Sequence, residues 1–410
     1  MRHIRHLPVS TGVAPRLVGL ASLVLAAGIT ASCTSGAEPE AGVSGTGRAS
    51  ASGALQSRSE PLLPPPGDQP LPEDTGDRLQ DVIDEWVADG NNIGITAAVV
   101  TAGGTWAGAA GVDGAGVELV PESAMAIGSV TKTFVAAEVM RLVGEGRINL
   151  DAPVTDYVPV SFDARGATVR QVLGMRAGFP MDQVLQVRET AAEDLDRSWS
   201  IADSLAFVEP HGPRDVLGSF TYNNVNYWVL GQMLEQVTGE PLATSLTRDL
   251  IEPAQLERIW VQDAQQPRPP LALSEELPTL DTVDDDGPWL PSRSIASAAT
   301  GPGDIAADSP SIARWGYLLY GGHVIDSALV TQMTEGEAAG EGWWYGLGTE
   351  GEVQDGQLLV GHNGDIWTYH GVLRVAMEEG VSIAVHVPAP PRDESILDVP
   401  ALLREALSKS

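Results

Sequence analysis

The sequence is poor in cysteine and in positive charge. Of its 410 residues only Cys33 is a cysteine, which excludes an intrachain disulfide framework and a zinc site built from cysteines. Lysine and arginine number 24 against 55 aspartates and glutamates, giving a formal net charge of -31. Such a chain repels polyanions, so we expect no binding of nucleic acid and no electrostatic attraction to an anionic membrane. The histidines are scattered and no glycine-rich phosphate loop is present, so no metal and no cofactor is predicted.

The N-terminal 33 residues have the pattern of an export signal. Three arginines without an acidic residue precede an uncharged apolar stretch, residues 17–29, which is too short for a membrane span. The stretch ends in Thr30-Ala31-Ser32-Cys33, which resembles a bacterial lipobox. We therefore predict a signal peptide over residues 1–33, with Cys33 as the lipidation site and a plain secretory signal as the alternative. The protein is expected to be extracytoplasmic, either lipid-anchored to the cell membrane or secreted.

Residues 34–75 are dominated by Ser, Gly, Ala, Glu and Pro. A segment of this composition cannot bury enough apolar surface to offset its chain entropy, so we predict a disordered tether. The remainder, residues 76–410, is predicted to be one hydrolase domain.

Periodicity in this domain predicts an α+β fold. Strand patterns occur near both ends of the domain, and helical patterns lie mostly between them. This order predicts an antiparallel sheet built from both termini, flanked by helices, with an inserted helical region. The predicted strands are residues 93–101, 105–110, 357–360, 372–377 and 381–387. The predicted helices are residues 78–88, 131–143, 169–173, 226–237, 243–250, 312–319 and 396–408.

A serine and a lysine stand three residues apart in Ser129-Val130-Thr131-Lys132. A small-residue turn precedes them and an apolar helical run follows, which places Ser129 at a helix N-terminus and Lys132 one turn further on the same face. A hydroxyl becomes a good nucleophile when a neighbouring base takes its proton, and a desolvated lysine can be that base. The chain has only two lysines, Lys132 and Lys409, and arginine could not replace them in this role.

At these residues the chain resembles the serine β-lactamase and D-alanyl-D-alanine carboxypeptidase family, which includes class C enzymes, R61-type DD-peptidases and related esterases. The resemblance extends through residues 146–154, 168–173 and 345–348. The second family motif, Y-x-N, is present as Tyr222-Asn223-Asn224, and the third as His362-Asn363-Gly364. The resemblance implies a β-lactamase/transpeptidase-like fold and covers most of residues 76–400.

The resemblance also implies roles for individual residues. Ser129 would be the acylated nucleophile, and Lys132 and Tyr222 the general base pair, with the question of which takes the proton left open. Asn224 would hold both Lys132 and the substrate, and His362 would assist Tyr222 or contact substrate. The oxyanion hole would consist of the backbone N–H groups of Ser129 and of Asp365, the residue after the third motif. The substrate and oxyanion residues are thus Asn224, His362, Asn363, Gly364 and Asp365.

The third motif departs from the pattern of enzymes that recognise a substrate carboxylate. Asn363 and Asp365 replace the usual hydroxyl residues, and residues 342–361 contain no lysine or arginine. The family's default function is a D-alanyl-D-alanine carboxypeptidase or penicillin-interactive enzyme. The missing hydroxyl and basic residues favour an esterase or amidase acting on uncharged or cationic acyl compounds. A third hypothesis is a non-catalytic lipoprotein that binds cell-wall fragments or peptides. The expected partner is therefore a small-molecule or peptide acyl substrate, with the membrane reached only through the lipid anchor.

Overall fold

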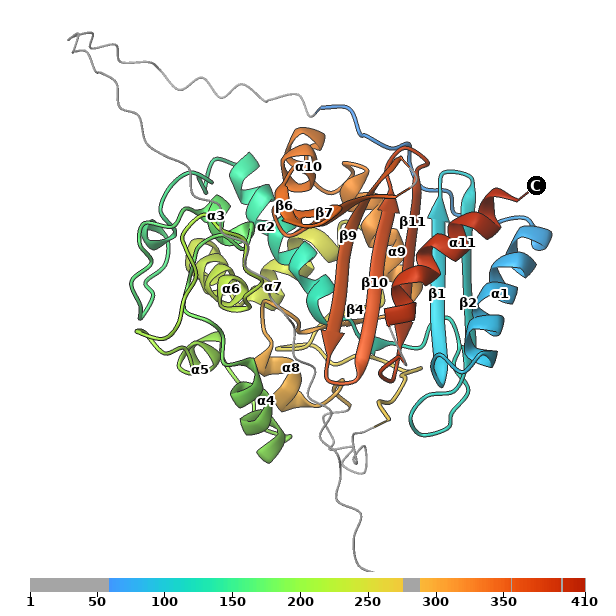
Figure 1. Cartoon of the computed structure of the whole chain (residues 1–410), viewed down its shortest axis with the longest axis horizontal. Coiled ribbons are helices and arrows are strands. Elements are labelled where there is room, and N and C mark those ends of the chain that lie inside the picture. Colours follow the sequence, from blue (N-terminus) through green and yellow to red (C-terminus); the bar gives the residue numbers. More distant parts are fainter. Residues whose placement is uncertain (1–58, 276–287, 355, 392–393, 410) are drawn as a thin grey trace, which may run out of the picture. The chain divides into compact units, whose positions relative to one another are not determined.

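The main sheet is assembled from both ends of the folded chain. The computed structural model describes residues 59–275, 288–354, 356–391 and 394–409. Its eight antiparallel strands have the order β2-β1-β11-β10-β9-β8-β7-β6, so the first hairpin pairs directly with the last strand. This arrangement confirms the predicted α+β fold (Figure 1). The strands from the two ends are β1 (Gly94–Thr101), β2 (Gly104–Gly111), β9 (Gln357–Ile366), β10 (Tyr369–Ala376) and β11 (Val381–Val387).

Three edge strands and a second sheet were not predicted. The edge strands β6 (Glu337–Gly340), β7 (Trp343–Tyr345) and β8 (Glu350–Gln354) are short and lack a clear apolar alternation. The second sheet joins β3 (Met125–Ala126), β5 (Ile305–Ala307) and β4 (Ile259–Val261), all of them buried. Strands of two or three residues are too short to show any periodicity.

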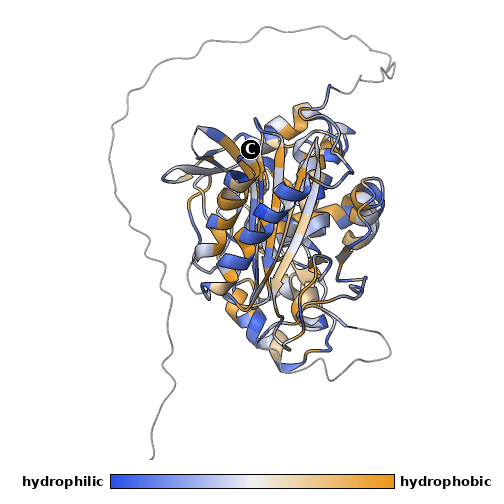
Figure 2. Cartoon of the chain, turned by 90° about the vertical axis from the view of Figure 1, so that its right-hand side faces the viewer, coloured by the Kyte–Doolittle hydropathy of each residue, from blue (hydrophilic) through white to orange (hydrophobic). Residues whose placement is uncertain are grey.

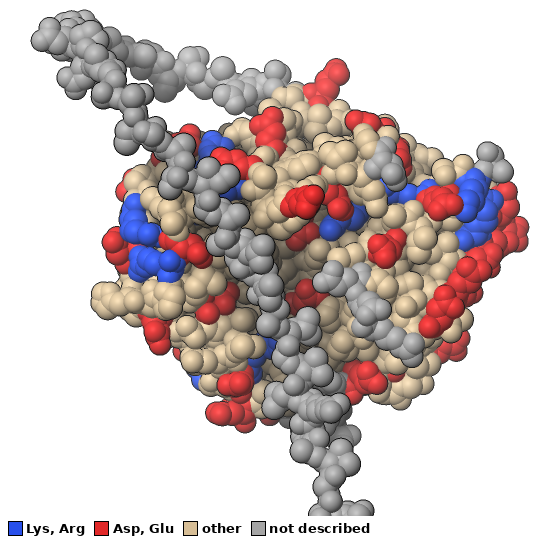
Figure 3. Space-filling model, viewed as in Figure 1, with Lys and Arg blue, Asp and Glu red and all other residues tan. Residues whose placement is uncertain are grey.

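Helices cover both faces of the main sheet. On one face α1 (Glu73–Ala88) and α11 (Val399–Ser408) pack against each other and against the sheet, and α1 buries Leu79, Ile83 and Trp86. Both helices are hydrophilic where they face outward (Figure 2), and acidic side chains line the edge formed by α1 (Figure 3). On the other face α9 (Ser309–Tyr320) lies across β1 and β11.

The helical region is inserted between the two sets of strands, as predicted. None of the helices among the described residues is long and apolar enough to span a membrane. The α-helices of the inserted helical region are α2 (Thr131–Gly144), α3 (Val169–Leu173), α4 (Val184–Glu193), α5 (Ile201–Leu205), α6 (Val225–Thr238), α7 (Leu242–Leu246), α8 (Arg293–Ala298) and α10 (Ser327–Thr334). Short helical turns are η1 (Gly128–Val130), η2 (Val154–Asp156), the π-helical η3 (Thr247–Ile251) and, near the C-terminus, η4 (Glu394–Asp398).

The predicted tether is wrong at its C-terminal end. The backbone N–H groups of Leu62 and Leu63 donate to Gly321 O at 2.8 and 3.3 Å, and Gly67 N donates to Thr101 O at 2.9 Å. Leu63 is only 6% exposed and belongs to the main core, and α1 already begins at Glu73. Residues 59–75 are therefore part of the folded body. The predicted signal segment with Cys33, and the tether up to residue 58, lie outside the described residues.

We expect Leu63→Ala to lower the free energy of unfolding by about 2 kcal/mol, because it removes a buried side chain from the core. Its neighbour Leu62 is 45% exposed and gives a matched control, for which we expect a change below about 0.5 kcal/mol. Urea unfolding of the two variants measures the difference. Equal effects would show that residues 59–72 are not part of the cooperative unit.

Candidate active site

Ser129 and Lys132 lie side by side where the helical region meets the main sheet. Ser129 is in the turn η1, which leads directly into α2, and Lys132 is in the first turn of α2. The Nζ atom of Lys132 donates to Ser129 Oγ at 2.7 Å. Ser129 is half-buried and Lys132 is fully buried. The structure thus brings together the serine and the amine that the spacing predicted.

A second partner of Lys132 was not predicted. Lys132 Nζ also donates to the backbone carbonyl of Pro302 at 2.9 Å. Pro302 lies in the turn between α8 and β5, where Gly303 N donates to Ala299 O and Gly301 N to Asp304 Oδ1. These bonds fix the turn and aim its carbonyl at the amine.

Burial changes the acid–base properties of Lys132. It lowers the pKa of the amine from 10.5 to about 7, because a charged ammonium is disfavoured away from water. The nearby carboxylates of Asp182, Glu350 and Asp365 act in the opposite direction and keep the pKa from falling further. A neutral amine is therefore available near neutral pH, in contact with a hydroxyl.

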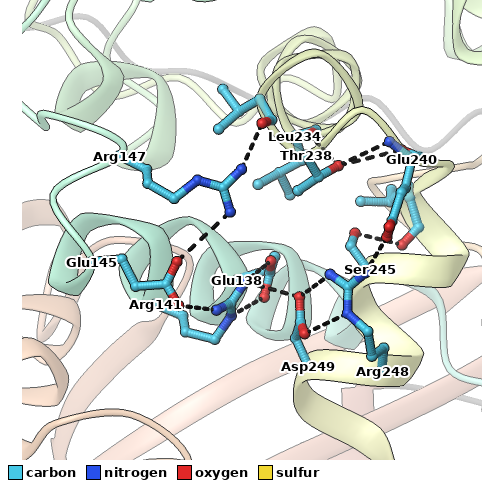
Figure 4. A network of polar contacts seen from close by, with 12 residues as sticks. Glu138, Arg141, Glu145, Arg147, Leu234, Thr238, Glu240, Ser245, Arg248 and Asp249 are labelled. Carbon is cyan, nitrogen blue, oxygen red and sulfur yellow. Dashed lines mark hydrogen bonds and ion pairs between the residues drawn. The ribbon is translucent and has the colours of Figure 1, made fainter.

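The helix that carries Lys132 is held by a buried ion pair. Arg141 donates from Nε and Nη2 to the two carboxylate oxygens of Glu138, at 2.8 and 2.7 Å, and from Nη2 to Asp249 Oδ2 at 2.8 Å. Glu138 is fully buried, and Asp249 in η3 also binds Arg248 (Figure 4). Burial raises the pKa of Glu138, and Arg141 opposes this rise. The network connects α2 to η3 and so positions the first turn of α2.

Tyr222 completes the group around the serine. The residue is 38% exposed overall, but its hydroxyl end is enclosed beside Ser129. Burial raises the Tyr222 pKa well above 10, and the hydrogen bond with Ser129 opposes this change. The Nζ atom of Lys132 lies 5.0 Å from the centre of the Tyr222 ring. At neutral pH the phenol therefore keeps its proton and can donate it.

Asn224 does not make the predicted contact with Lys132. It is the residue before α6, and its backbone N–H donates to Asp182 Oδ2 at 2.9 Å. Among the described residues, the hydrogen bonds of Lys132 go to Ser129 and Pro302, not to the Asn224 amide. The predicted contact with Lys132 is thus replaced by the Pro302 carbonyl. Asn224 does line the cavity beside Ser129, where a substrate could reach it.

His362 lies behind the site and not in it. The side chain is 1% exposed, its Nε2 is 3.0 Å from Tyr345 Oη, and its ring centre is 6.1 Å from that of Tyr222. Burial lowers the pKa of this histidine. Direct contact with substrate, one of the predicted roles, is inconsistent with this burial. His362 instead supports Tyr345, which packs edge-on against Tyr222.

Two glycines let the end of β9 approach the serine. A Cβ atom on Gly364 would lie 2.0 Å from Ile127 O, and one on Gly128 would lie 2.6 Å from Asp365 N. Gly128 also has a φ of +51°, which disfavours other residues. The backbone of Asp365 therefore lies against the turn that carries Ser129. The role of the Asp365 N–H as a second oxyanion donor stays a prediction, for which this closeness is a requirement.

The side chains of Asp365 and Asn363 are each paired with a residue of β10. Asp365 is 69% exposed and forms an ion pair with His370 on β10. Asn363 Oδ1 accepts a hydrogen bond from Arg374 Nη2 at 2.8 Å, on the side of β9 opposite to His362. Arg374 does reach the third motif, but it is already paired with Glu350 at 3.3 Å and Glu352 at 3.1 Å. It adds no free positive charge there.

A mainly apolar cavity of about 150 Å³ opens beside Ser129. We call it the acyl cavity. Trp367 lines this cavity, whereas Trp343 packs edge-on against Phe220 and Trp344 donates to Thr334 O. Among the described residues, no group of three His, Cys, Asp or Glu is placed to hold a metal ion.

The site has a serine beside a buried lysine at the start of a helix, and both face the end of an antiparallel strand. This arrangement is found in serine hydrolases with an S-x-x-K motif. The family model described as Beta-lactamase matches residues 79–407. The chain therefore belongs to the Beta-lactamase family, whose members are serine hydrolases. This membership confirms the resemblance seen in the sequence.

Known proteins similar to this chain include enzymes and penicillin-binding proteins. Protein flp of Staphylococcus aureus (strain MW2) is 27% identical over 150 residues, 34% of this chain and 28% of that protein, so the match spans under a third of that relative. Penicillin-binding protein 4 of Amycolatopsis lactamdurans is 27% identical over 66% of this chain and 74% of its own. The D-amino acid amidase of Ochrobactrum anthropi SV3, complexed with D-phenylalanine, superimposes with a TM-score of 0.70 at 22% identity, covering 82% of this chain and 100% of that one. At this identity the superposition shows the fold alone.

Sequence reasoning missed three residues at the site that belong to loops or to the short helix α4. Asp182 and Pro302 both affect Lys132, and Arg188 lines the acyl cavity. The Gly301-Pro302-Gly303 run indicated a turn, but not what the turn would contact. Asp182 and Arg188 lie in no motif, so the sequence offered no signal for either.

We expect the kcat/KM of the protein for an acyl substrate to rise with pH and to level off above a midpoint of about 7, because only the neutral Lys132 can accept the serine proton. Lys132→Arg should lower kcat/KM by about a thousandfold on the plateau above pH 7 and should remove the rise with pH, since arginine stays protonated. Lys409→Arg, at the other lysine, is the matched control and should leave the profile unchanged. Substantial turnover by Lys132→Arg would contradict Lys132 as the base.

Gly364→Ala should lower kcat/KM by about a hundredfold, because the added methyl group would push the end of β9 away from Ser129 and displace the Asp365 N–H. Gly103→Ala is the control: its Cβ would meet only Thr101 Oγ1, at 3.6 Å. Steady-state kinetics of both variants, with circular dichroism to confirm folding, test this expectation. A folded and fully active Gly364→Ala would show that Asp365 N–H takes no part.

Proposed function

We propose that the protein hydrolyses esters or amides through an acyl intermediate on Ser129. The observation that carries this proposal is the 2.7 Å contact between Ser129 Oγ and the amine of Lys132, whose pKa is lowered by burial to about 7. Lys132 rather than Tyr222 is the base in this proposal, because burial keeps the phenol of Tyr222 protonated.

Acylation would proceed in two steps. Neutral Lys132 takes the proton of Ser129 as Oγ attacks the substrate carbonyl carbon, and the carbonyl oxygen becomes an oxyanion. The N–H groups of Ser129 and Asp365 stabilise this oxyanion. The tetrahedral intermediate then collapses, and the proton passes from Lys132, directly or through Tyr222, to the leaving group.

Hydrolysis of the acyl intermediate follows the same steps, with water in place of the serine. Lys132 accepts a proton from a water molecule as its oxygen attacks the acyl carbon. The bond to Ser129 Oγ breaks, and the proton returns to the serine. The cycle consumes one water molecule and needs no cofactor.

The surroundings of the third motif favour substrates without a carboxylate at that point. Arg374 is paired with Glu350 and Glu352, so a substrate carboxylate there would meet acidic side chains and no free cation. This favours an esterase or amidase over a carboxypeptidase. The shared fold with a D-amino acid amidase is consistent with that choice.

The second candidate function is a D-alanyl-D-alanine carboxypeptidase or penicillin-interactive enzyme. The observation in its favour is the similarity to penicillin-binding protein 4 over 66% of this chain. A non-catalytic binding protein is the least favoured hypothesis, because a ligand-binding cleft does not need a deprotonatable amine in contact with a serine.

We further propose that the protein acts outside the cytoplasm, anchored through a lipid on Cys33. This proposal rests on the sequence of residues 1–33, namely the basic start, the short apolar stretch and the lipobox-like end.

The proposed function is tested by intact-mass spectrometry after mixing the purified protein with p-nitrophenyl butyrate and, separately, with benzylpenicillin. We expect a transient butyryl adduct on Ser129 and release of p-nitrophenol, both absent in Ser129→Ala. A stable penicilloyl adduct without ester turnover would instead support the second candidate. Absence of any adduct with either compound, together with no release of p-nitrophenol, would contradict both catalytic functions.

The chain offers a matched control serine. Ser309 Oγ lies 2.8 Å from His386 Nδ1, but both residues are buried and cannot meet a substrate. Ser309→Ala should therefore retain the adduct and the turnover. Loss of the adduct in a folded Ser309→Ala would contradict the assignment of Ser129.

A further inference from the structure

The acyl cavity reaches Ser129 but not the side chains of Lys132 and Tyr222. Its lining includes Ser129, Asn224 and the end of β9, but neither Lys132 nor Tyr222. A leaving group must receive a proton from Lys132 or Tyr222, so it departs on their side. The other substituent of the carbonyl, the acyl chain, therefore points into this cavity.

The cavity walls suit a short apolar chain. Helix α4 contributes Val184, Val187 and Ala191, and α8 contributes Ile295 and Ala298. These side chains have no polar atoms, so they bind methylene groups and offer nothing to a polar group beside the carbonyl.

One cationic side chain lines the cavity. It is Arg188 on α4, whose guanidinium carbon lies 5.1 Å from the ring centre of Trp367 on the facing hairpin. Arg188 is exposed, and among the described residues its guanidinium has no carboxylate or carbonyl partner. The other charged residue of the lining, Asp365, is paired with His370. The guanidinium donors of Arg188 are thus available to a ligand.

The platform under Arg188 is rigid. Trp367 has a left-handed backbone (φ 56°), an unfavourable conformation for a tryptophan that persists only where the surroundings enforce it. The surroundings enforce this backbone conformation because the next two residues are fixed. The Thr368 hydroxyl forms a hydrogen bond with the Ser274 hydroxyl, and Tyr369 Oη donates to Ala272 O at 2.8 Å. The indole is thereby held against the cavity, and stacking on it limits the positions of the guanidinium.

We propose that Arg188 selects acyl groups that carry a carboxylate at their far end, separated from the scissile carbonyl by a short apolar chain. This inference rests on the proposed function, and it revises the expected preference for uncharged or cationic acyl groups. The planar guanidinium fork matches a carboxylate, and the apolar walls match the methylene chain.

Because the protein as a whole is strongly negative, a substrate with a carboxylate needs a local positive charge in order to bind. The chain carries a net charge of -31, and acidic side chains are spread over the face shown in Figure 3, whereas basic ones occur in a few patches. The acidic residues Glu350 and Glu352 lie in a separate cavity with Trp343 and Asn363. A carboxylate held by Arg188 thus avoids Glu350 and Glu352.

The test compares two esters of equal chain length, mono-p-nitrophenyl glutarate and p-nitrophenyl valerate, with the full-length protein. We expect the wild type to prefer the glutarate ester in kcat/KM by about tenfold, a value reduced for the exposure of Arg188. Arg188→Gln should abolish this preference and Arg188→Glu should reverse it, in both cases because kcat/KM for the glutarate ester falls more than kcat/KM for the valerate ester. Raising the ionic strength should reduce the preference of the wild type only.

Arg197 provides the matched control. It also stacks on a tryptophan, Trp199, at 3.9 Å, but it does not line the acyl cavity. Arg197→Gln should therefore keep the preference for glutarate. Hydrolysis of both esters with equal kcat/KM in the wild type and in Arg188→Gln would overturn this inference and leave the proposed function intact. Hydrolysis of neither ester would overturn both.

Discussion

The burial of one amine governs the organisation of this protein. Lowering the pKa of Lys132 from 10.5 to about 7 corresponds to a cost of about 5 kcal/mol for keeping the amine charged in the folded state. The fold tolerates this cost because the core around α2 and the Glu138–Arg141 pair hold the helix in place. The same burial that disfavours the charge makes the amine a base. Stability and reactivity are therefore opposed at this residue.

The second constraint is the close approach between the backbone at the end of β9 and the backbone of the turn η1. Gly128 and Gly364 leave no room for side chains between the end of β9 and the turn η1. The sheet and the helical region thus meet at the serine through main-chain atoms, whose positions depend little on the choice of neighbouring side chains. Specificity can then vary in the walls of the acyl cavity, on α4 and α8, without moving the reacting groups.

Local spacing explains what the sequence could predict. Ser129 and Lys132 are three residues apart on one helix, so their proximity follows from helix geometry. The hairpin β1–β2 and the strand β11 have continuous apolar or β-branched patterns and were predicted close to their observed bounds. The opposite orientations of His362 and Asn363 were also predictable, because side chains alternate along a strand.

The remaining features depend on tertiary contacts that leave no periodic signal. Pro302 and Arg188 reach the site from a turn and from a short helix, and their partners are far away in the sequence. Residues 59–72 were misassigned because their composition resembles that of a linker, although the buried side chain of Leu63 and several backbone hydrogen bonds attach them to the folded body. An average over composition cannot detect such individual contacts.

The pairing of β1 with β11 delays formation of the active site until almost the whole chain is present. Thr96 pairs with His386, about 290 residues later, so the centre of the main sheet can close only when almost the whole chain is present. The end of β9 reaches Ser129 as part of that sheet. A chain still being synthesised therefore carries Ser129 and Lys132 without the end of β9 beside them, and the complete site forms only in the finished fold.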